Sequence, residues 1–398
     1  MGGPNAISSL RDEVTEESRW KKQKMLEIAS KILLASRFRV VVTLVGISAL
    51  FFLSAAQIGL LVGWCNTTSA ILRHTDADLW VMARETTTFD YGTPIPEHRA
   101  YQVQNVAGVQ HTEQMYLGWT IWQCPDGRRV NVELVGLDDR CNGAPWKMAK
   151  GDAIDVLRPD AVIVDELFLK DLGVTTVGDD IEIAGRRAVV TGISRDVRSF
   201  TAAPFVFTSI ESARRFSPHY SLDEITYVLV KCQPGIDPVS VRDRIQQQVP
   251  HVDCMTKQDF IIRTVKYWML ETGAGLTVIC TAVLGFAVST VVTSQTLYSI
   301  TQDHLDHYAT LLAVGFRRIR LVGIVLGQSA MLACLAAIIS SCVYFLMASQ
   351  LSDSPVRMET TALIYSLIVA VSILGCIAGS IFSIRSVMHI DPVEVFRA

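Results

Sequence analysis

Four long stretches without a charged residue set the strongest constraint on how this chain folds. Each is rich in apolar residues and contains no histidine: Val40 to Trp64, Gly273 to Ile300, Leu321 to Leu351, and Thr360 to Ile384. A helix of about 20 apolar residues crosses the bilayer core. A buried helix of a soluble protein rarely runs this far without a charge. The sequence therefore predicts four transmembrane helices.

The first stretch has the features of a permanent anchor. It begins 40 residues into the chain, is longer than the apolar region of a signal peptide, and is not followed by a clear small-residue cleavage site.

The distribution of lysine and arginine predicts the orientation of these helices. Cytoplasmic flanks of membrane helices are enriched in both residues. The basic flanks here are Arg19, Lys21, Lys22, Lys24, Lys31, Arg37 and Arg39, then Arg317, Arg318 and Arg320, and finally Arg385 and Arg397. All of them lie on one side if both termini are cytoplasmic. We therefore expect a multi-pass protein of the inner (cytoplasmic) membrane that exports residues 65–272.

The segment before the first predicted span has helical periodicity. Between Ser18 and Ser36 apolar positions recur every three or four residues, and lysines occupy much of the remaining surface. This pattern favours a basic amphipathic helix on the inner membrane surface. A solvated helix that packs on the protein itself is the alternative.

The exported segment is predicted to be α+β. Strand patterns at 76–83, 110–117, 120–123 and 129–137 accompany a helix pattern at 96–109, and Asp126-Gly127 indicates a hairpin. The order strand, helix, strand returns at 225–232, 237–249 and 251–256. The two units together predict one four-stranded ferredoxin-like layer. Residues 150–220 between them have the pattern of a small β-rich insertion.

Several kinds of chemistry lack their sequence motifs. There is no G-x-S-x-G, no H-E-x-x-H and no phosphate-binding P-loop; the dipeptide GK does not occur. The net charge of −3 does not indicate a nucleic-acid partner. We therefore expect no enzymatic activity, no catalytic residue, and no cofactor or metal bound by this chain.

The predicted spans contain no ionisable side chain, unlike proton- or ion-driven carriers. Their polar residues are Ser, Thr and a few glutamines, Gln57, Gln295 and Gln328, for which hydrogen bonds between helices are the expected role.

The exported part contains four cysteines, Cys124, Cys141, Cys232 and Cys254. Disulfides are permitted there, but spacing does not define their pairing.

The stretch 303–320, DHLDHYATLLAVGFRRIR, lies between the second and third spans. Its two histidines and two aspartates raise three possibilities: a metal site, a proton relay, or a contact for another protein. His304 and Asp306 do not share a helix face with the other two, which argues against a metal site. A position outside the membrane argues against a proton relay.

The apolar residues of this stretch favour the third possibility. Leu305, Tyr308, Ala309, Leu312 and Ala313 recur at helical spacing, and Gly315 is predicted to end the helix. A short amphipathic helix between two spans can dock in a cleft of a cytoplasmic partner. A purely structural turn is the alternative.

Several segments together resemble the permease subunits of the MacB/FtsX-like ABC transporter superfamily, and most of all its DevC branch. They are FRVVVTLVGISALFFLSAAQIGL, HTDADLWVMAR, VDELFLKDLGVTTVGDDIEIAGRRAVVTGI, TLYSITQDHLDHYATLLAVGF and IRSVMHIDPVEVFRA. The likeness covers nearly the whole chain.

The resemblance implies that the helix from Asp303 to Gly315 is a coupling helix that sits on a separate ATPase subunit. The docking residues would be Asp306, His307, Tyr308, Leu311, Leu312 and Gly315. Many relatives carry R-E-I-G-x-x-x-A-x-G at this place. This chain keeps Ala313 and Gly315 but has Asp306 and His307 instead of the Arg-Glu pair.

The resemblance also implies a division of the chain. The predicted segments are a cytoplasmic amphipathic segment 1–39, spans 40–64, 273–300, 321–351 and 360–384, a porter-like layer 65–149 and 221–272, an inserted lobe 150–220, the coupling helix 301–320, a short extracytoplasmic link 352–359, and a cytoplasmic tail 385–398.

The function implied is that of a homodimeric membrane permease driven by an ABC ATPase that binds ATP and Mg²⁺. Export through a periplasmic adaptor and an outer-membrane duct is the first expectation. Force relay to an exported enzyme, without transport, is the second. A membrane receptor without an ATPase is an alternative of a different class, and the helix at 303–315 argues against it.

Overall fold

The structure is a computed structural model that describes residues 37–199, 203–217, 223–303, 305–314, 317–351, 358 and 360–388. It divides into a helical unit (Met1–Leu60, Thr277–Gln350 and Met358–Ala398) and a sheet unit (Leu61–Leu276 with Leu351–Arg357). The predicted N-terminal amphipathic helix, most of the link 352–359 and the tail beyond residue 388 lie outside the described residues.

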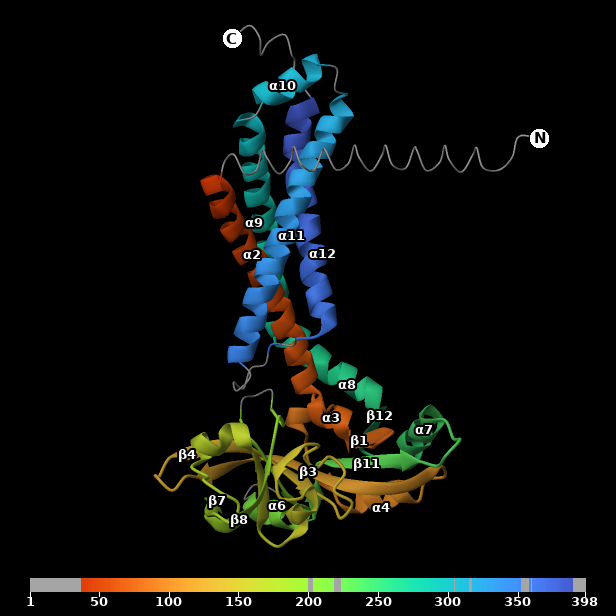
Figure 1. Cartoon of the computed structure of the whole chain (residues 1–398). Helices are drawn as coiled ribbons and strands as arrows, with labels where there is room; N and C mark the ends of the chain where they lie inside the picture. Colours follow the sequence, from red (N-terminus) through yellow and green to blue (C-terminus); the bar gives the residue numbers. More distant parts are fainter. Residues whose placement is uncertain are drawn as a thin grey trace, which may run out of the picture. The chain divides into compact units, whose positions relative to one another are not determined.

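Four long helices make up most of the helical unit and confirm the four predicted spans. They are α2 (Arg37–Thr68), α9 (Ala274–Asp303), α11 (Arg318–Gln350) and α12 (Ala362–Met388). Each contains a segment long and apolar enough to cross a membrane. They run alongside one another as a bundle (Figure 1).

Small residues and hydroxyl groups hold these helices together. A Cβ atom at Gly59 would overlap the Tyr344 hydroxyl, so α2 and α11 approach closely there. The Ser340 hydroxyl of α11 donates to the Ser48 carbonyl at 2.9 Å, and α11 is joined to α12 by the Ser329 hydroxyl, which donates to the Cys376 carbonyl at 2.7 Å. Within a bilayer, burial of apolar surface does not favour helix association, because the lipid tails are apolar as well. Close packing at small residues and hydrogen bonds between helices are therefore the expected contacts.

The sheet unit contains one large sheet and a separate two-stranded pair. The strands are β1 (Leu79–Ala83), β2 (Ile95–Pro96), β3 (Val109–Gln123), β4 (Arg129–Leu137), β5 (Met148–Lys150), β6 (Ala161–Asp165), β7 (Asp180–Ile183), β8 (Arg186–Ser194), β9 (Phe205–Ser209), β10 (Glu224–Ile225), β11 (Tyr227–Cys232) and β12 (Val252–Thr256). The large sheet has the order β12-β1-β11-β3-β4-β9-β6-β8-β5, with β7 paired to β3 and β8, while β2 pairs with β10.

The helices of this unit are short. They are α3 (Ala70–His74), α4 (His98–Gln104), α5 (Leu169–Leu172), α6 (Ile210–Phe216), α7 (Pro238–Gln248) and α8 (Lys257–Lys266), with single turns η1 (Phe89–Tyr91), η2 (Ala153–Leu157), η3 (Glu166–Phe168) and η4 (Tyr267–Glu271).

The first four strands in the sheet order form the ferredoxin-like layer that the sequence predicts. β1 lies between β12 and β11, β11 lies between β1 and β3, and all three pairings are antiparallel. The connection from β1 to β3 contains α4, and the connection from β11 to β12 contains α7. Two strand–helix–strand units thus interlock in one sheet.

Alternation along each strand decides which helices cover which face. In β1, Trp80 and Met82 join the cluster that α3 and α8 complete, while Leu79 and Val81 join the cluster that α4 and α7 complete. Successive side chains of a strand point to opposite faces. α3 and α8 accordingly lie on one side of the sheet and α4 on the other (Figure 1).

The segment 150–220 is rich in β-strands, as the sequence predicts. Its strands continue the same large sheet: β9 pairs in parallel with β4, placing Phe205 beside Glu133, and β7 pairs with the end of β3. β3 is also one strand of 15 residues rather than two. This long strand and its hairpin partner present an edge whose backbone groups need partners, and the segment supplies them.

The predicted Asp126-Gly127 hairpin is confirmed. β3 and β4 pair from Met115 opposite Leu137 to Gln123 opposite Arg129, and Gly127 has a φ of +86°.

All nine cysteines are free thiols in the structure.

Candidate functional site

The connection between α9 and α11 contains the short helix α10 (Leu305–Ala313), which lies at one end of the helix bundle (Figure 1). Most of the apolar face that the sequence predicts is present, but Ala313, the last residue of the predicted stripe, is exposed. This face joins the neighbouring ends of α11 and α12 in one cluster, made of Leu305, Tyr308, Ala309 and Leu312 with Leu321, Ile324, Val325, Met331 and Ile384. The protein's own helices therefore cover this face.

Tyr308 lies in this cluster and not on a surface where a partner could contact it. Its side chain is 0% exposed, so it is enclosed by the helical unit instead of lying on a surface open to a partner. Leu312 is half-buried against the same cluster. Direct docking by these two residues stays a prediction, and what the structure shows is that they fix α10 to α11.

Tyr308 and Gln328 form an unusual polar feature in this cluster. The Tyr308 hydroxyl and both amide atoms of Gln328 are buried without a hydrogen bond of ordinary geometry. Burial raises the pKa of the Tyr308 phenol, and the neighbouring Gln328 side chain opposes the shift. Gln328 of α11 thus lies beside Tyr308 of α10, while the hydroxyl groups of Ser329 and Ser340 bond α11 to α12 and α2.

The opposite face of α10 is open to solvent. Thr310 and Ala313 are exposed, and Val314, just beyond the helix, is 76% exposed. The backbone of Asp306, His307 and Leu311 belongs to α10, whereas their side chains, and Gly315 as a whole, lie outside the described residues. Sequence reasoning overlooked Val314, although an apolar residue off the predicted stripe was the available signal.

Three arginines stand at the start of α11. Arg317, Arg318 and Arg320 are all exposed, and Arg318 Nη1 donates to the Met388 carbonyl at 2.8 Å. The start of α11 is thereby tied to the end of α12. The open face of α10 thus has an exposed apolar residue, Val314, and exposed arginines follow it in the sequence.

Within the described residues, no three His, Cys, Asp or Glu side chains come together as a metal site. His304 lies outside them.

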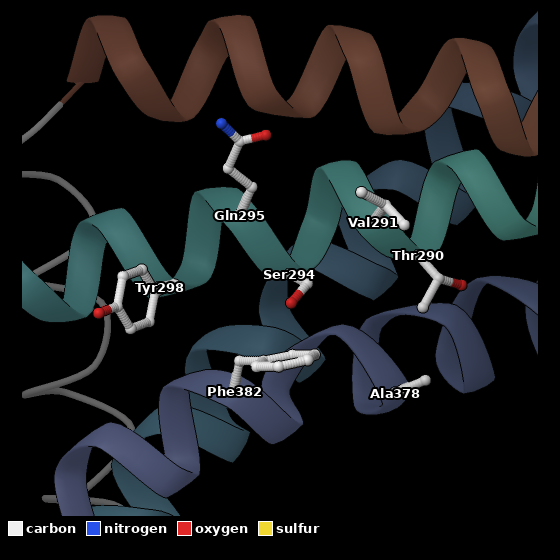
Figure 2. A pocket seen from close by; sticks show the side chains of 7 residues that line it. All are labelled: Thr290, Val291, Ser294, Gln295, Tyr298, Ala378 and Phe382. Atoms are coloured by element: carbon white, nitrogen blue, oxygen red, sulfur yellow. The ribbon is translucent and has the colours of Figure 1, made fainter.

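A hollow of about 430 Å³ opens between α9 and α12. Its lining consists of Thr290, Val291, Ser294, Gln295, Tyr298, Ala378 and Phe382. Ser294 lies on the side of α9 that faces α12, while Gln295 points toward α2 (Figure 2). The lining has hydroxyl and amide groups but no charged side chain.

Comparisons with known proteins agree with this architecture. Residues 41–248 match the family described as MacB-like periplasmic core domain, and residues 279–392 match the family described as FtsX-like permease C-terminal. Uncharacterised ABC transporter permeases of Mycobacterium tuberculosis and Mycobacterium bovis are 24% identical over 365 residues, which cover 90% of this chain and 95% of theirs.

Two solved structures are similar to part of the chain. The periplasmic region of MacB from Actinobacillus actinomycetemcomitans is 13% identical with a TM-score of 0.37 and covers 49% of this chain and 95% of that one. The extracellular domain of YknZ from Gram-positive bacteria is 12% identical with a TM-score of 0.34 and covers 45% of this chain and 98% of that one. The DevC branch stays a prediction. Because one family match alone spans more than half of the chain, the chain belongs to the MacB/FtsX-like family of ABC transporter permeases.

Proposed function

We propose that a separate ABC ATPase docks on the open face of α10 and drives this permease, and that two copies of the chain act together. The ATPase binds ATP and Mg²⁺, and the chain itself performs no catalysis. Both termini and α10 face the cytoplasm, and the sheet unit faces the periplasm. Movement of the sheet unit promotes export through a periplasmic adaptor and an outer-membrane duct.

The packing of α10 carries this proposal. A helix held to α11 and α12 by buried Tyr308 and half-buried Leu312 transmits a push to both spans. Its other face carries the exposed residues Thr310, Ala313 and Val314. One side of the helix thus anchors it and the other side is available to a partner.

The test is ATPase stimulation in a reconstituted complex of the chain with its ATPase. Val314→Arg and Thr310→Arg place a large charged group on the open face without entering the buried cluster. We expect each to reduce stimulation about tenfold or more, as loss of a central contact does. Asp306→Lys tests the polar contact that the family resemblance implies.

Ile154→Arg is the matched control, because Ile154 is also highly exposed, at 64%, but belongs to the sheet unit. It should leave stimulation unchanged. If Val314→Arg, Thr310→Arg and Asp306→Lys all stimulate as the parent does, α10 is not the docking site.

Force relay to an exported enzyme is the second candidate function. The observation that favours it is that the residues lining the hollow between α9 and α12 include no charged side chain, so this hollow offers no partner to a charged substrate. A mild-detergent pull-down of the tagged chain, followed by mass spectrometry, separates the two. An ATPase with a periplasmic adaptor supports export, and an ATPase with a cell-wall enzyme supports force relay. Recovery without any ATPase would contradict both.

A further inference from the structure

The second span begins within the sheet unit. α9 starts at Ala274, and the chain up to Leu276 belongs to the sheet unit. The π-helical turn η4 ends just before it, at Glu271. η4 packs back onto the first turn of α9, where a Cβ atom at Gly275 would lie 2.6 Å from the Met269 carbonyl oxygen. Because a span passes through the headgroup layer where it leaves the bilayer core, we expect η4 at the level of that layer.

A hydrogen bond connects η4 to a segment from a distant part of the chain. Trp268 Nε1–H donates to Asp90 Oδ2 at 2.9 Å, across 178 residues of sequence. Tyr91 follows Asp90, and its ring centroid lies 5.9 Å from that of Trp268 and 6.5 Å from that of Tyr267. Tyr91 thus lies beside the start of the second span.

The segment that carries Tyr91 is fixed to the sheet and to α8. Within η1, Phe89 accepts a hydrogen bond at its carbonyl from the Tyr227 hydroxyl of β11 at 2.6 Å, and its N–H donates to Thr264 Oγ1 of α8 at 3.3 Å. The rings of Phe89 and Tyr227 stack with centroids 5.4 Å apart. The core of the sheet unit therefore sets the place of Tyr91 next to η4.

The rings of Tyr91, Tyr267 and Trp268 form a surface that the protein covers only in part, called here the aromatic patch. Tyr91 is 51% exposed, and Tyr267 and Trp268 are half-buried. Leu270, on the same turn as the last two, is 59% exposed. Tyrosine and tryptophan are enriched at membrane–water interfaces, because their rings have an apolar body for lipid and a polar atom for the headgroups.

We propose that the aromatic patch rests in the phospholipid headgroup layer and attaches the sheet unit to the bilayer surface from which α9 emerges. The continuity of the patch with the span identifies a lipid surface as its occupant. Exposed leucines stand on both sides of the entry to α9, Leu270 in η4 and Leu276 in the helix. The inference concerns the sheet unit and the bilayer, so it holds or fails independently of docking by an ATPase.

Tyr91 is the residue whose membrane contact only the tertiary structure indicates. η4 is adjacent to a span in the sequence, so its contact with lipid follows from the chain itself. Tyr91 instead lies in the stretch ETTTFDYGT, a polar segment outside the four charge-free stretches. A contact between Tyr91 and lipid is therefore the observation that decides the proposal.

Hydroxyl-radical footprinting of the full chain in nanodiscs of a saturated phosphatidylcholine, read by mass spectrometry, measures this contact. Tyr101 is the matched control within the same molecule, because it is also an exposed tyrosine, at 62%, and belongs to α4, on the other side of the sheet from α8. We expect radicals to modify Tyr91 about fivefold more slowly than Tyr101, since residues in the interface are shielded from water.

Leu270 serves as the positive reference in this experiment, because its place next to the span should protect it in any case. If Tyr91 and Tyr101 are instead modified in proportion to their exposed fractions, Tyr91 faces water and the proposal fails.

Collision rates of a nitroxide distinguish lipid from a protein that covers the patch. The label is attached in nanodiscs to the single-cysteine variants Tyr91→Cys and Tyr101→Cys. At position 91 we expect more frequent collisions with oxygen, which concentrates in lipid, than with a water-soluble nickel chelate, and the reverse at position 101. Infrequent collisions with both reagents at 91 would mean that a second copy of the chain covers the patch. Nickel collisions as frequent at 91 as at 101 would mean exposure to water. Either result overturns the proposal.

Discussion

Tyr308 shows how a single residue can change its role between sequence and structure. In the sequence it is one member of an amphipathic stripe, and the stripe fits a surface contact as well as an internal one. In the structure it is fully enclosed beside Gln328. Periodicity identifies the face of a helix but not what covers that face.

Two substitutions at Tyr308 distinguish what its ring contributes to stability from what its hydroxyl contributes. Tyr308→Ala removes a large buried ring and should lower the free energy of unfolding by about 3–5 kcal/mol, as truncation of buried aromatic residues does. Tyr308→Phe keeps the ring and removes only the hydroxyl beside Gln328, so it should change the free energy of unfolding by no more than about 1 kcal/mol. Denaturant unfolding of the purified protein in detergent measures both. If Phe is as harmful as Ala, the hydroxyl has an essential partner and the packing role is wrong.

The elements of the sheet unit were largely predictable because local pattern and local structure agree. β11, α7 and β12 lie within the predicted ranges, and the interlocked strand order follows from two repeated strand–helix–strand units. The errors arose where pairing with distant strands decides the outcome. β3 continues through a predicted break because β4 pairs with it over its outer half, and the parallel pairing of β4 with β9 joins segments about 70 residues apart.

The contact between α6 and the sheet depends on one residue without a side chain. A Cβ atom at Gly136 of β4 would lie 2.7 Å from Ala213 Cβ of α6 and 2.8 Å from Tyr116 Cβ. Gly136→Ala should therefore push α6 outward and lower the free energy of unfolding by about 1–3 kcal/mol, the usual cost of overpacking. Thermal unfolding of the full chain provides the measurement.

A compensating substitution provides the control for this contact. Ala213→Gly alone should cost about 1 kcal/mol, because glycine is a poor helix former. Combined with Gly136→Ala, it should recover part of the stability that Gly136→Ala loses. If the two effects simply add, the close approach of α6 does not explain the requirement for glycine at position 136.

The two units of the molecule differ in the kind of surface that they expose. The four helices of the helical unit expose large apolar side chains such as Leu284 and Phe382, as surfaces in contact with lipid do. The sheet unit buries its apolar residues in three clusters of its own. This contrast, with the positions of lysine and arginine, predicts which unit faces which compartment.

Thiol labelling of single-cysteine variants tests the predicted orientation. Val314→Cys on the α10 side and Ile154→Cys in the sheet unit place one thiol each at highly exposed positions, 76% and 64% in the parent residues. In intact spheroplasts a membrane-impermeant reagent should label the cysteine at 154 nearly completely and the one at 314 hardly at all. Permeabilised cells should show both labelled. Labelling at 314 but not at 154 before permeabilisation would reverse the topology.

The sequence by itself determined what depends on neighbouring residues: four spans from charge-free stretches, an amphipathic helix between the second and third, and two strand–helix–strand units. The tertiary structure alone decided what depends on distant partners. It placed Asp90 beside Trp268, from segments 178 residues apart, and made Glu133 a buried acid on a strand whose alternating pattern shows nothing unusual. Burial and partners set the energy of a polar group, and they come from elements that local periodicity does not bring together.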